Sequence, residues 1–104
     1  MSGRLFDAPV LHGDVSSAAR ALLSVPQIDR ERLCIRMIAE AELADAHVLR
    51  TGRLHPIYGN GSLMAVARNR SLPDEPDFDD VRYCQCFETV LRHLVRFQIS
   101  QRHS

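Results

Sequence analysis

A glycine-rich loop near the middle of the sequence holds the residue types best suited to ligand chemistry. The run HPIYGNGS occupies residues 55–62 and leads directly into a short helical pattern. Glycines let consecutive N–H groups point at one spot, and the start of a helix adds partial positive charge. No acidic residue lies between Thr51 and Pro73, whereas basic residues are frequent there. The loop is therefore a candidate site for a small anion, either a phosphate or a carboxylate.

The predicted ligand-binding residues of this loop and of the helix after it are Arg53, His55, Asn60, Gly61, Ser62 and Arg68. An ordinary turn with a serine cap and solvated arginines produces the same pattern, so both interpretations stay open. The loop is not a P-loop, because the GxxxxGK[ST] pattern is absent and no strand precedes it.

A carboxylate on the apolar side of the longest helical pattern is the second candidate. Asp45 falls among alanine and leucine positions of residues 29–51, and a buried carboxylate needs a partner. We expect Asp45 to be a structural group that ties this helix to the loop at residues 52–62. Glu42 lies three residues earlier, so an acid–base site formed by both carboxylates and His55 is an enzymatic alternative. The sequence names no substrate, and we predict no catalytic residue.

Cysteine and histidine spacing predicts neither a metal site nor a cofactor. Cys84 and Cys86 are two residues apart and point in different directions on a helix, so they cannot share one metal there. Together with Cys34 they are interpreted as small buried hydrophobic residues. The five histidines form neither an HxxxH nor an HExxH pattern.

Four helical patterns must position these residues. They are expected at about residues 15–24, 29–51, 63–69 and 80–100, with Asp14 and Ser62 as N-caps and Gly52 as a left-handed C-cap. Residues 71–80 hold two prolines and five acids, which is typical of a surface linker. No strand-like alternation lasts past four residues. The predicted fold class is all-α: a compact bundle of three main helices plus the short one, with residues 29–51 central.

Length and composition fit one helical domain over residues 1–104, with residues 1–13 as an N-terminal arm. The formal net charge of zero gives no field toward nucleic acid or membrane. The acids of residues 29–42 would repel the phosphates of nucleic acid, so nucleic acid is not an expected partner. No apolar run approaches the roughly 18 residues of a membrane helix, and no secretory signal is apparent. Three cysteines in no framework spacing favour a cytoplasmic location.

The run DAHVLRTGRLHPIYGNGSLM, residues 45–64, resembles short helical hypothetical proteins from GC-rich bacteria. All 13 basic side chains are arginine, which is typical of such genomes. The resemblance implies a bacterial protein with a helical fold. It carries over no activity and no catalytic or binding residue.

The broad apolar side of the last helix predicts a surface for another chain. Its members are Tyr83, Cys84, Phe87, Val90, Leu91, Leu94, Val95 and Phe97. Leu43 adds an apolar residue on the polar side of the helix at 29–51, and a bundle this small is not expected to cover all of this surface. The expected function is a non-enzymatic helical interaction or assembly module, either a homodimer or a binder of another protein. The alternative is a binder of a small anionic ligand at the Arg53–Ser62 loop.

Overall fold

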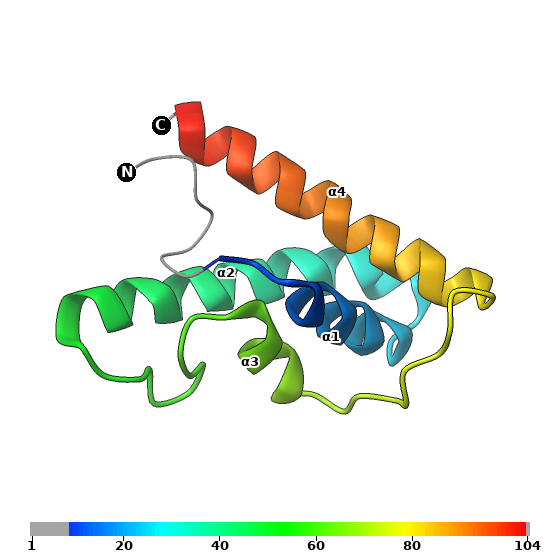
Figure 1. Ribbon diagram of the computed structural model, residues 1–104, viewed down its shortest axis with the longest axis horizontal. Helices are drawn as coiled ribbons and strands as arrows, with labels where there is room; N and C mark the ends of the chain where they lie inside the picture. Colours follow the sequence, from blue (N-terminus) through cyan, green and yellow to red (C-terminus); the bar gives the residue numbers. More distant parts are fainter. Residues whose placement is uncertain (1–8, 104) are drawn as a thin grey trace.

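Four helices and their connections form the part of the chain that this computed structural model describes, namely the backbone of residues 9–103 and the side chains of residues 9–101. They are α1 (His12–Leu23), α2 (Gln27–Thr51), α3 (Leu63–Arg68) and α4 (Val81–His103) (Figure 1). Within residues 9–103 the strand-like pairing consists of a single bridge between His55 and Gly59. The all-α prediction is confirmed, and the helix ends differ from the expected ones by at most three residues.

The helices pack around α1 and along α2. Both α1 and α2 contact all three other helices, whereas α3 and α4 do not pack against each other. In Figure 1, α4 crosses obliquely over α2, and its C-terminal end lies away from α2. Six consecutive residues of α1, positions 14–19, are buried, since small alanine and serine side chains let neighbours approach from every side. The most completely enclosed helix is therefore α1, while α2 gives the bundle its length.

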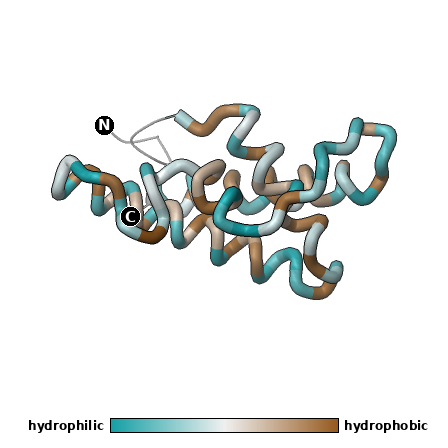
Figure 2. The backbone as a smooth tube through the Cα atoms, turned by 90° about the horizontal axis from the view of Figure 1, so that it is seen from below, coloured by the Kyte–Doolittle hydropathy of each residue, from teal (hydrophilic) through white to brown (hydrophobic). Residues whose placement is uncertain are grey.

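Side chains from all four helices meet in one hydrophobic core. Hydrophobic positions, brown in Figure 2, recur at intervals along the helical parts of the chain, as expected for helices with one side turned inward. The largest fully buried side chains are Leu22, Cys34, Met37, Leu63, Val66, Tyr83, Cys86 and Val90. Leu49, on the last turns of α2, is 62% exposed. At this end of α2 the last helix has already diverged from it (Figure 1).

The prediction that Asp14 is the N-cap of the first helix is wrong. The N-cap is Leu11, and Asp14 lies inside the first turn. From there its Oδ2 accepts a hydrogen bond from the Leu11 N–H at 2.8 Å, and its Oδ1 accepts one from the Met64 N–H at 2.9 Å. A carboxylate three residues into a helix can reach back to the N-cap amide, which explains why the helix begins earlier than expected. Asp14 therefore joins the starts of α1 and α3.

The other predicted caps are confirmed. Gly52 adopts φ 72° and its N–H donates to the Val48 carbonyl, which ends α2. Ser62 accepts a hydrogen bond from the Ala65 N–H through Oγ at the start of α3. Asp80, the last acid of the linker, accepts from the N–H groups of Arg82 and Tyr83 at the start of α4.

The predicted arm at residues 1–13 is described only in part. Residues 1–8 lie outside the described residues. Val10 packs against the core, and His12 and Gly13 already belong to α1. The helix begins inside the predicted arm because the Asp14 carboxylate holds the Leu11 amide at the helix start.

Candidate functional site

The loop after α2 satisfies most of its polar groups internally. His55 Nδ1 accepts hydrogen bonds from the N–H groups of Ile57 and Tyr58 at 3.0 and 3.1 Å, so the proton of the neutral ring is assigned to Nε2. The same ring stacks on Tyr58 at a centroid distance of 4.9 Å. Asn60 Oδ1 accepts from the Ser62 N–H at 2.9 Å. These side chains hold the turn in shape, as the turn interpretation of the sequence requires.

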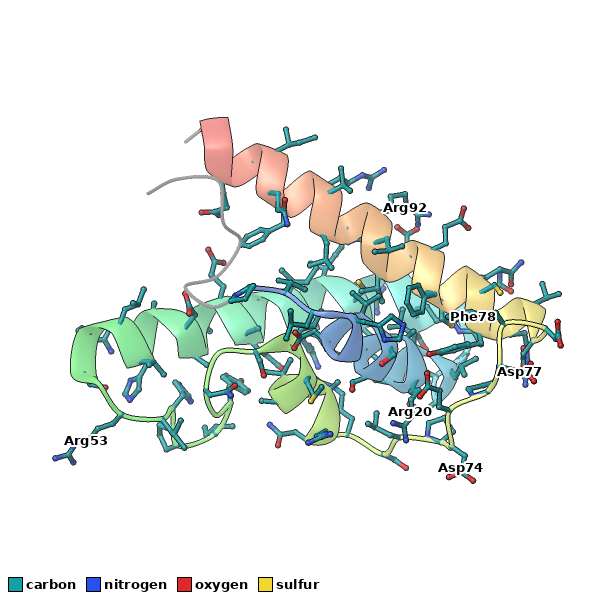
Figure 3. All side chains as sticks on the ribbon, in the orientation of Figure 1. Arg20, Arg53, Asp74, Asp77, Phe78 and Arg92 are labelled. Atoms are coloured by element: carbon teal, nitrogen blue, oxygen red, sulfur yellow. The ribbon has the colours of Figure 1, made fainter. Side chains whose placement is uncertain are left out.

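Two N–H groups of the first turn of α3 are also engaged. Asp14 accepts from Met64 and Ser62 from Ala65, so a carboxylate of the chain itself already lies at the start of this helix. Arg53 is exposed and points outward from the far end of the molecule in Figure 3. Arg68 is exposed as well. Anion binding at this loop stays a prediction, with fewer free donors than the sequence suggested.

Asp45 lies directly against the backbone of the loop. A Cβ placed on Gly61, whose φ is 92°, would lie 2.7 Å from the Asp45 Cα and 2.9 Å from its Cβ. Only glycine therefore allows the loop to approach α2 so closely at this point. Asp45 is half-buried rather than fully buried. That its carboxylate ties α2 to the loop stays a prediction.

The three residues of the enzymatic alternative lie apart in the hollows described for residues 9–101. Glu42 lines a hollow between α2 and α4 and accepts a long hydrogen bond of 3.5 Å from Gln101. Asp45 instead lines a small hollow with Asn60, Gly61 and the start of the described chain. His55 lines neither of these two hollows, and its Nδ1 is occupied by the loop. In these two hollows, among the described residues, the three side chains do not come together.

One side of α4 presents an exposed apolar surface, which we call the α4 face and define as Phe78, Cys84, Phe87, Leu91 and Val95. These residues, with Glu88 and Arg92 at the edge, line a shallow hollow of about 520 Å³. Phe78 comes from the linker and lies beside the first turns of α4 (Figure 3), where its ring is 5.3 Å from that of Phe87. Phe78, Leu91 and Val95 are 56%, 46% and 57% exposed. The apolar side predicted for the last helix thus divides into a buried part and this uncovered part.

The opposite side of α4 is joined to α2 by a charged bridge. His93 Nε2 donates to Glu31 Oε1 at 2.8 Å, and Arg92 Nη2 donates to the same oxygen at 3.3 Å. These hydrogen bonds lower the pKa of Glu31 below its ordinary value, and the bond from His93 has the larger effect. Nearby, burial raises the pKa of the Cys34 thiol to about 12, so this thiol stays protonated at neutral pH.

Two side-chain pairings that position these surfaces were missed in the sequence. One is the bridge at Glu31. The other is a two-point ion pair in which Arg70 donates to both carboxylate oxygens of Glu40 at 2.9 Å. Although Glu40 is a charged residue, its side chain is only 14% exposed because of this pairing. No local signal could reveal either pair, because the partners lie 30 or more residues apart.

The residues described here give no sign of a metal site or of a membrane span. Within residues 9–101, His, Cys, Asp and Glu side chains do not gather in groups of three or more that could hold a metal ion. Over the described helices, none has the length and apolar character needed to cross a bilayer.

Fold and surface define a small all-helical protein with an uncovered apolar face. The chain belongs to the family described as "Domain of unknown function (DUF7742)", whose model matches residues 8–94. The match includes α1, α2, α3 and more than half of α4. Neither the curated proteins nor the solved structures contain a significant match to this chain.

Proposed function

We propose that this protein is a non-enzymatic helical interaction module that self-associates as a homodimer through the α4 face. The observation that carries the proposal is the row of exposed apolar side chains on α4, with Phe78 extending it onto the linker. Exposed apolar side chains that form a continuous patch are typical of surfaces that bind another protein. A bacterial cytoplasmic setting is part of the proposal, supported by the three free cysteines and the resemblance described above.

A second copy of the chain is the partner that the charges at the edge of the face favour. Glu88 and Arg92 are one helical turn apart on the same edge of the α4 face. Glu88 has no ion-pair partner among the described residues, and Arg92 shares only one oxygen of Glu31. Two α4 helices packed antiparallel about a two-fold axis would place each Glu88 opposite the Arg92 of the other copy. The same axis would bring Leu91 of both copies together at the centre.

The mass of the protein in solution tests this proposal. Sedimentation equilibrium of the full chain is expected to give twice the mass of one chain, falling to one chain in Leu91→Glu, because two carboxylates would then meet in an apolar contact. Ile28→Glu is the matched control: Ile28 is 88% exposed, but it lies on α2 outside the α4 face, so this variant should remain a dimer. A wild-type chain that stays monomeric, or a dimer that survives Leu91→Glu, refutes the proposal.

Charge exchange tests the antiparallel arrangement separately. Glu88→Arg should weaken the dimer, since the new arginine of each copy would face Arg92 of the other copy and the two positive charges would repel each other. Arg92→Glu should weaken it for the converse reason. Mixing the two variants should restore a dimer that contains one copy of each. If the mixture is no better than either variant alone, the two-fold arrangement is wrong even though self-association through the α4 face can still hold.

A further inference from the structure

A polar hollow lies between the first turns of α2 and the first half of α4, on the side of α4 opposite the α4 face. Its volume is about 180 Å³, and it is lined by Gln27, Arg30, Glu31, Gln85, Cys86, Thr89 and Arg92. At roughly 30 Å³ per water molecule, the hollow has room for about six waters. It is smaller than the roughly 300 Å³ at which pockets begin to hold whole drug-sized ligands. A charged head group fits it better than a large organic body.

The charges that line the hollow are predominantly positive. Arg30 and Arg92 contribute two guanidinium groups against the single carboxylate of Glu31. That carboxylate already accepts hydrogen bonds from Arg92 and His93. The Glu31–Arg92 pair therefore comes close to neutral, and Arg30 supplies the net positive charge of the hollow. Cys86 adds no negative charge, because burial raises the pKa of its thiol. The amides of Gln27 and Gln85 supply neutral N–H donors.

The arginine on α2 is held in place before any ligand arrives. Arg30 Nε donates to the Leu22 carbonyl at the end of α1, at 3.1 Å. This bond fixes the plane of the guanidinium group and uses one of its five N–H donors, leaving the terminal nitrogens for a ligand. A guanidinium group matches the geometry of tetrahedral oxyanions, to which it can donate two parallel hydrogen bonds. Fixing the group in advance lowers the entropic cost of binding.

We propose that this hollow binds a phosphate-type oxyanion, with Arg30 as the main anchor, Arg92 at the second edge, and the amides of Gln27 and Gln85 as further donors. This is the ligand class that the sequence predicted for the loop at residues 53–62, but at a different place in the fold. It does not depend on the α4 face, because that face lies on the other side of the helix and uses different side chains apart from Arg92.

Side-chain NMR of the full-length ¹⁵N-labelled protein tests the proposal. Inorganic phosphate is titrated against chloride at constant ionic strength, and the Arg30 Nε–H and the amides of Gln27 and Gln85 are followed. Saturable shifts of these signals are expected. Arg30→Gln should weaken phosphate binding about tenfold or more, the factor that corresponds to about 1.4 kcal/mol. Arg32→Gln, an exposed arginine on the same helix outside the hollow, should bind within twofold of wild type.

A second variant guards against a loss of folding in Arg30→Gln. Gln85→Glu places a carboxylate at the exposed rim of the hollow, where it should weaken binding by repulsion while leaving the helix intact. The control is Gln98→Glu, the same substitution at a half-buried position of α4 outside the hollow. Titration with a nucleoside monophosphate separates the sources of the oxyanion. Tighter binding than phosphate identifies a phosphate ester as the ligand, and equal binding identifies the free ion. Shifts that do not saturate, that appear at Asn60–Ser62 instead, or that survive both variants overturn the proposal.

Discussion

Removing the Asp14 carboxylate should destabilise the protein by about 3 kcal/mol. Asp14 is only 7% exposed, and its two oxygens accept from the N–H groups of Leu11 and Met64. A hydrogen bond to a charged group contributes about 1.5–3 kcal/mol, so Asp14→Ala loses about 3 kcal/mol at the lower end of that range. For a domain of this size each kcal/mol corresponds to about 4–8 °C, which gives a fall in Tm on the order of 12–24 °C. Asp14→Asn keeps one acceptor oxygen and should lose about half as much.

Urea and thermal unfolding of three variants would measure this loss. Asp29→Ala is the matched control, because Asp29 is also an acid in the first turn of a long helix. Among the described residues its side chain makes no hydrogen bond to another element. Its loss should cost no more than about 1 kcal/mol, the usual size of a charge effect at a helix start. The urea m-value should not change in any of the three. If Asp14→Ala costs no more than Asp29→Ala, the inferred link between α1 and α3 contributes nothing to stability.

Three further predictions follow from single side chains. Gly61→Ala should lower the free energy of unfolding by several kcal/mol, because the added Cβ meets the backbone of α2. Gly52 has a similar positive φ but open space around it, so Gly52→Ala should lower the free energy of unfolding by about 1 kcal/mol in the same urea titrations. In protein dilute enough to be monomeric, Cys84 should react readily with a thiol reagent, and all three thiols should react after unfolding. Fast reaction of three thiols in the native protein would contradict the burial of Cys34 and Cys86. Because the pKa of Glu31 is lowered from 4.5 in the folded state, its stabilisation is present above pH 4.5 and disappears as the pH falls through the folded value. Stability curves of wild type and Glu31→Gln should therefore converge in acid.

The two proposed interactions use different sides of α4. Self-association uses the α4 face, while the oxyanion site uses the side that faces the start of α2. Arg92 lies at the edge of both, since it lines both hollows; it donates to Glu31, and its side chain is 42% exposed. A phosphate titration of the dimer would show whether the two events influence each other: if they compete for Arg92, phosphate shifts the mass toward one chain.

Periodicity and turn chemistry in the sequence were sufficient to predict the helices and several of their ends. Apolar spacing near 3.6 residues predicts all four helices, because one side of each must face a core. Gly52 and Ser62 are recognisable as caps, since a left-handed C-cap favours glycine and a free helix start favours a hydroxyl acceptor. These are local effects, in which a residue interacts with neighbours three or four positions away, so the sequence alone contains them.

Tertiary structure decided which polar groups meet and which apolar side chains stay uncovered. Asp14 has the residue type of an N-cap, and its hydrogen bond to the Leu11 amide is local, but its second hydrogen bond goes to an amide of α3 that lies 50 residues away in the chain. Glu31 pairs with His93 of α4, and Arg30 donates to Leu22 at the end of α1. Both contacts exist only because the fold brings these helices together. Likewise, the apolar side of α4 is one continuous pattern in the sequence. It separates into a buried part and an exposed face only in the folded protein, because α1 and α2 pack against part of the apolar side of α4 and leave the rest uncovered.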